Sequence, residues 1–98
     1  MLKITDENRV VLQPYVQQFV RLANTMTKDG VPIAVVSSAF MTACATYSSY
    51  VVAGNNGALR ESGVEKLADI FATELTAIQR LKIEQATAEG AIVKEGAP

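Results

Sequence analysis

The carboxylates of residues 61–74 are the side chains whose type and spacing best fit a catalytic or ligand-binding role. Glu74 lies between Phe71 and Ile78, on the apolar stripe of a predicted helix. A carboxylate in that place is partly desolvated, which is how proteins tune a carboxyl group for general acid or base catalysis. The alternative is that Glu74 lies at the edge of the stripe and reaches water along its flexible stem. Glu74 is therefore kept as a candidate residue of a pocket between helices.

The other groups that could bind or react have plainer interpretations. Glu61, Glu65 and Asp69 follow one another at steps of four residues, which favours a solvated acidic helix face over a cation site. The single cysteine, Cys44, has no histidine or basic residue near it in sequence to stabilise a thiolate, so we expect a buried structural thiol. The chain has no histidine, the commonest general base and metal ligand. We predict no catalytic residue, no metal site and no cofactor.

A glycine-rich turn has the form of an RNA-binding clamp. Residues 54–57 read Gly-Asn-Asn-Gly, and KH domains clamp RNA backbones with a G-x-x-G loop. That clamp belongs to a domain that contains strands and is usually basic, whereas we predict no strand here and the turn has no Lys or Arg. The net charge of −1 shows no basic excess either. We therefore predict a plain helix–helix turn and no nucleic-acid partner.

Three helices must position these residues. The first runs from Asp6 or Pro14 to Lys28, because apolar residues recur there at three- and four-residue steps until Asp29-Gly30 ends the pattern. The second runs from Pro32 to about Ala53 and the third from near Ser62 to near Gly90. We predict one all-α domain over residues 1–90, a three-helix bundle with the second helix at its centre, and a disordered tail over residues 91–98.

The second predicted helix lies in a run without charge. Residues 31–59, 29 in a row, include no Asp, Glu, Lys or Arg. On a helical wheel the bulky side chains gather on one side, where we expect the first and third helices to cover them and to bury the tyrosines in a core. This bulky face comprises Ile33, Val36, Phe40, Ala43, Tyr47, Tyr50 and Val51. The opposite side, the small-residue face, comprises Ala34, Ser38, Thr42, Ala45, Ser49 and Val52.

Three interpretations of the small-residue face compete. The flanking helices wrap far enough to cover it; or it is a surface for self-association or for a protein partner; or the helix spans a membrane. A length of about 20 apolar residues suits a bilayer. However, four serines and two threonines dilute the hydrophobicity, the flanking helices are amphipathic like those of a soluble bundle, and no basic cluster orients the segment. We therefore do not expect a membrane span.

Part of the chain resembles a family of small proteobacterial proteins of unknown function. The resemblance covers about residues 15–81, with Phe19-Val20-Arg21-Leu22-Ala23-Asn24 in place of an F-I-x-L-A-N segment and residues 38–51 in place of an A-A-R-Y-N-A-F helix. Phe71 stands for the central aromatic of the third helix. Thr46 and Ser48 depart from the family, which tends to have arginine and asparagine there. The resemblance implies a compact helical fold and no known activity.

These observations favour a non-catalytic function. We predict a small interaction or regulatory protein that self-associates, or binds a protein partner, through the small-residue face. The alternatives are a small-ligand-binding protein or enzyme that uses Glu74, and a membrane-associated helical protein. One cysteine cannot form an internal disulfide, and the charged residues among the first ten do not fit a signal peptide, so we expect a cytoplasmic protein.

Overall fold

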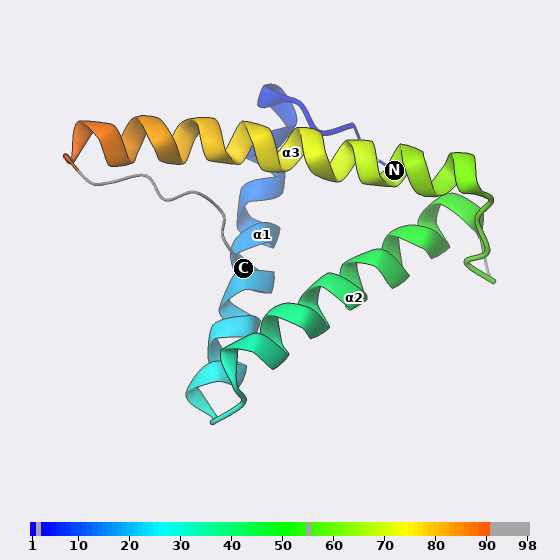
Figure 1. Cartoon of the computed structure of the whole chain (residues 1–98), viewed down its shortest axis with the longest axis horizontal. Coiled ribbons are helices and arrows are strands. Elements are labelled where there is room, and N and C mark those ends of the chain that lie inside the picture. The colour runs from blue at the N-terminus through cyan, green and yellow to red at the C-terminus, as the bar shows by residue number, and fades with distance from the viewer. Residues whose placement is uncertain (2, 55, 91–98) are drawn as a thin grey trace. The chain divides into compact units, whose positions relative to one another are not determined.

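The computed structural model describes residues 1, 3–54 and 56–90. It is all-α, with the helices α1 (Asp6–Lys28), α2 (Ile33–Ala53) and α3 (Glu61–Ala88), and the described residues include no strand (Figure 1). The fold class and the three predicted helices are confirmed, and each boundary lies within about two residues of its prediction. The predicted tail over residues 91–98 lies outside the described residues.

The first helix takes the earlier of its two predicted starts. The Thr5 hydroxyl oxygen accepts a hydrogen bond from the Asn8 backbone N–H at 3.1 Å, which satisfies one of the free donors at the helix start. Asp6 and Glu7 add negative charge to the first turn, where the helix dipole favours it. Pro14 therefore lies inside α1 and removes one backbone hydrogen bond without ending the helix.

The chain divides into two units, which are described separately. The first unit covers Met1–Arg60 and contains α1 and α2; the second begins at Glu61 and contains α3. Within the first unit, α1 and α2 are joined by a tight turn in which the Val31 N–H donates to the Met26 carbonyl at 3.1 Å. The two helices approach each other at this turn and diverge away from it (Figure 1). The single domain over residues 1–90 and its bundle packing stay predictions.

The bulky face of α2 is far less covered than the sequence suggested. Among the described residues only Val36 is buried, with 6% of its surface exposed. Val36 lies in the first turn of α2, beside the connection to α1, and the remaining residues of the bulky face are exposed, Tyr47 to 74%. Tyr15 and Tyr50 are exposed as well. The prediction of a core that contains the three tyrosines is therefore wrong, because α1 diverges from α2 beyond the turn.

The turn after α2 is built from two glycines with left-handed backbone angles. Gly54 has a φ of 86° and Gly57 a φ of 65°. The Gly57 N–H donates to the Gly54 carbonyl at 3.0 Å, and the Ala58 N–H donates to Asn56 Oδ1 at 3.0 Å. These hydrogen bonds occupy backbone groups that a clamp for phosphate would need to present, which agrees with a plain turn.

Alanine substitution at these glycines is expected to separate backbone strain from steric contact. A Cβ at Gly57 would lie 3.0 Å from Cδ1 and Cε1 of Tyr50, whereas a Cβ at Gly54 meets nothing within 4 Å. Gly54 has a φ of 86° and a ψ of −159°, a backbone region open almost only to glycine, so Gly54→Ala is expected to lower the free energy of unfolding by about 1–3 kcal/mol. Gly57→Ala is expected to lower it through its left-handed backbone and, in addition, through the contact with Tyr50. Urea unfolding followed by circular dichroism measures both. A Gly57→Ala loss that Tyr50→Ala does not reduce would contradict the contact.

Candidate functional site

The candidate site lies on α2, a helix that carries no charge at either end. The Pro32 carbonyl accepts hydrogen bonds from the N–H groups of Val35 and Val36, at 3.0 and 3.1 Å, and starts the helix. At the other end the Gly54 N–H donates to the Tyr50 carbonyl at 2.9 Å. The first turn contains no acidic residue and the last turn no basic one. The helix thus presents neutral side chains along its whole length.

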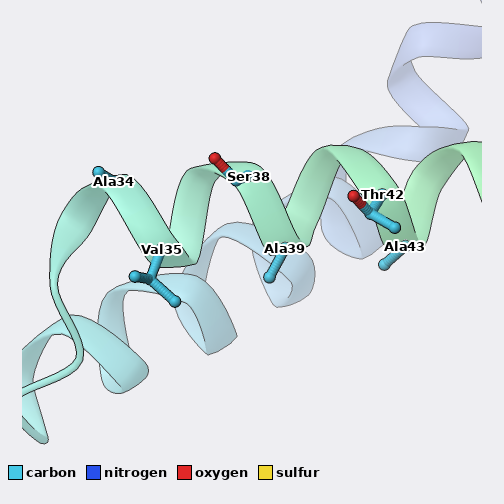
Figure 2. Close-up of a pocket in the computed structure, with 6 residues that line it drawn as sticks. All are labelled: Ala34, Val35, Ser38, Ala39, Thr42 and Ala43. Carbon is cyan, nitrogen blue, oxygen red and sulfur yellow. The ribbon is translucent and has the colours of Figure 1, made fainter.

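The small-residue face is open to solvent. Five of its six residues are exposed, and Ser49 is half-buried. Figure 2 shows that Ala34, Ser38 and Thr42 follow one line along α2, and that a second row runs beside them. A shallow depression follows these two rows; it is lined by Ala34, Val35, Ser38, Ala39, Thr42 and Ala43. The flanking helix α1 therefore does not wrap around this side of α2.

The depression coincides with only part of the predicted face. Ala45, Ser49 and Val52 continue the face toward the end of α2 but do not line the depression. Val35, Ala39 and Ala43 line it and were missed from the sequence, where Ala43 was assigned to the bulky face. Their spacing of four residues, shared with Ala34, Ser38 and Thr42, is the signal that could have identified them.

Two hydroxyl groups on α2 donate hydrogen bonds to backbone carbonyls of the same helix. Ser49 Oγ donates to the Ala45 carbonyl at 2.7 Å, and Thr46 Oγ1 donates to the Thr42 carbonyl at 2.8 Å. A buried donor that lacks a partner costs roughly 1–3 kcal/mol. Because the donors of Ser49 and Thr46 already have partners, another surface can cover them without that cost. Within the small-residue face this applies to Ser49, and Thr46 lies beside the face.

Cys44 is exposed, so the prediction of a buried structural thiol is wrong. The reason is the same divergence of α1 that leaves Tyr47 exposed, since burial on α2 is confined to Val36 beside the turn. The thiol is therefore accessible to solvent and to reagents.

The candidate pocket residue Glu74 is half-buried on α3. A depression on this helix is lined by Leu75, Thr76, Gln79, Arg80, Ile83 and Glu84, and it includes neither Glu74 nor Phe71. Glu61, Glu65 and Asp69 are all exposed, as expected for a solvated acidic face. Within the described residues, no group of three or more Asp, Glu, Cys or His side chains is placed to hold a metal ion.

Among the described helices, one has the length and composition of a membrane span. Ile33–Ala53 is long and apolar enough to cross a bilayer, as are many core helices of soluble proteins and signal sequences. Comparison with known proteins gives no further guide: no family model, no curated protein and no solved structure matches the chain. The resemblance to the proteobacterial family stays a prediction.

Proposed function

We propose that this protein is a small, non-catalytic interaction protein of the cytoplasm that associates with itself, or with a protein partner, through the small-residue face of α2. The observation that carries the proposal is the exposure of this face on a helix without a single charged residue. Helix faces that remain in water normally carry Lys and Glu, and contiguous exposed apolar surface usually marks an interaction site.

Two features of the face support close contact with another helix. Its side chains are small, so that a second backbone can approach, and the depression along Ala34, Ser38 and Thr42 offers a shallow seat for a ridge of side chains. The internal hydrogen bond of Ser49 lowers the cost of removing water from the face.

A charge placed on the small-residue face is expected to abolish association through that face. Ala45→Glu and Ser49→Lys each bring a charge into an interface that would have to desolvate it, which costs several kcal/mol per ion. Light scattering on the wild type is expected to give a mass above that of one chain, and the variants are expected to give a smaller mass than the wild type or to lose the partner. Circular dichroism checks that both variants keep their helix content.

The matched control is Ser37→Lys, which places the same charge on an exposed residue of α2 outside the face. It is expected to associate as the wild type does. The proposal would be contradicted by a wild type that is monomeric and binds no partner. It would also be contradicted if Ala45→Glu and Ser49→Lys associated as the wild type does.

The second candidate is a membrane-associated helical protein, which the length and composition of α2 favour. Its 21 residues span about 31 Å as a helix, close to the thickness of the hydrocarbon core. Flotation with neutral phosphatidylcholine vesicles distinguishes the candidates. A chain that floats with the vesicles and resists a carbonate wash supports the membrane candidate, whereas a chain that stays in the soluble fraction removes it.

A further inference from the structure

The third helix carries an apolar face of a different kind from that of α2. Its residues 64, 67, 71, 74, 78 and 81 alternate steps of three and four, the spacing of the core positions of a coiled coil. All of these are large and apolar except Glu74, and Phe71 has 53% of its surface exposed. The residues of this α3 seam are Val64, Leu67, Phe71, Glu74, Ile78 and Leu81.

The second unit offers the seam no cover of its own. Among its described residues, α3 is the only helix, and the turn at residues 89–90 follows it directly. A single amphipathic helix gains most of its stability from packing its apolar face, because propensity alone leaves helices in water marginal. Another helix must therefore cover the seam.

The charges of α3 indicate which helix that is and how it runs. The first half, residues 61–74, has four carboxylates and one lysine, a net charge of −3. The second half, residues 75–88, has Arg80, Lys82 and Glu84, a net charge of +1. Two copies of α3 side by side in parallel would place the two −3 halves together, whereas two antiparallel copies place each −3 half beside a +1 half. The helix is thus electrostatically complementary to itself, in the antiparallel direction only.

We propose that α3 pairs with α3 of a second copy of this chain as an antiparallel coiled coil, with its twofold axis between Ala72 and Thr73. The residues of the α3 seam are placed symmetrically about this axis along the whole length of the seam. Val64 lies opposite Leu81 of the second copy, and Leu67 lies opposite Ile78 of the second copy. Every seam residue thus faces a seam residue, as a twofold contact between identical surfaces requires.

The antiparallel direction also accommodates Glu74. It lies opposite Phe71 of the second copy, whose ring can pack on the aliphatic stem of Glu74 while the carboxylate reaches the edge of the interface. In a parallel pair, Glu74 would instead lie opposite Glu74 of the second copy, so that two carboxylates of like charge would face each other. At the end of the seam, Glu61 lies beside Lys82 of the second copy, an opposite-charge pair next to the seam.

Cross-linking between engineered cysteines tests the pairing. The chain carries Cys44→Ser, to remove the native thiol, and either Glu61→Cys or Lys82→Cys. In the proposed arrangement two copies of residue 61 lie about 35 Å apart along the axis and two copies of residue 82 about 28 Å apart, whereas residue 61 lies beside residue 82 of the second copy. A short bis-maleimide is expected to yield covalent dimer from an equilibrated mixture of the two variants and from neither variant alone.

Each other outcome overturns the pairing. Dimer from each variant alone indicates parallel helices, and no dimer in any sample indicates that the seam is covered within the chain or by a different protein. The pairing does not depend on the proposed role of α2, and the test keeps the two apart. When Ala45→Glu is added to both chains, the mixed cross-link is expected to persist, even if association through α2 is lost.

Discussion

The midpoint of thermal unfolding is expected to rise by about 7 °C when the protein concentration is raised a hundredfold. The reason is that Val36 is the only buried residue among those described, so the remaining apolar surface must be covered through association. At about 0.7 kcal/mol per residue near 60 °C, a dimer of this chain unfolds with an enthalpy of about 140 kcal/mol, and the van't Hoff relation then gives a shift of this size. Tyrosine absorbance and circular dichroism can follow the transition at both concentrations.

A midpoint independent of concentration would contradict this result. It would show that α1, α2 and α3 cover one another within a single chain, as in the three-helix bundle predicted from the sequence. Adding Ala45→Glu tests the two surfaces in the same experiment. If α3 pairs independently of α2, the variant keeps a concentration dependence while its midpoint falls.

Glu74→Leu is expected to tighten self-association by about a hundredfold or more. Glu74 is the one charged residue of the α3 seam, and it is already half-buried. Burying a leucine in its place contributes roughly 1.5–3 kcal/mol in each copy, and the twofold pairing counts it twice. Sedimentation equilibrium measures the dissociation constant, and the midpoint of unfolding is expected to rise with it.

The matched control for Glu74→Leu is Glu65→Leu, which removes the same charge from an exposed position on the opposite side of α3. An equal decrease in the dissociation constant for the two variants would indicate non-specific hydrophobic association and would contradict pairing through the α3 seam. Weaker association of Glu74→Leu would mean that the carboxylate itself makes a contact that association requires.

The helices could be predicted from the sequence because their signals are local. Prolines and glycines mark the ends, and the spacing of apolar residues marks the faces. The start of α1 was left open between Asp6 and Pro14, since a proline fits both a first turn and a helix that tolerates one lost hydrogen bond. The cap at Thr5, a purely local feature, decides between them.

Burial could not be predicted in the same way, because it depends on the angle between helices. Cys44 and Tyr47 have the residue types of a core, and a wheel places Tyr47 beside Val36; yet only Val36 lies close enough to the turn to be covered. Only three of the six residues that line the depression on α2 belong to the predicted face, for a related reason. The wheel divided the helix into two opposite faces, whereas the depression follows the boundary between them and draws Val35 and Ala39 from the flank.

The exposure of so many large apolar side chains also has a consequence for the lifetime of the protein in a cell. A copy that has not yet met its partner presents Phe19, Tyr47 and Phe71 to solvent, and such surface is what chaperones bind and proteases reach first. Assembly would then act as protection from degradation. In a pulse-chase measurement, Ala45→Glu chains would be cleared faster than wild-type chains made in the same cells, so that surplus copies are removed and assembled ones persist.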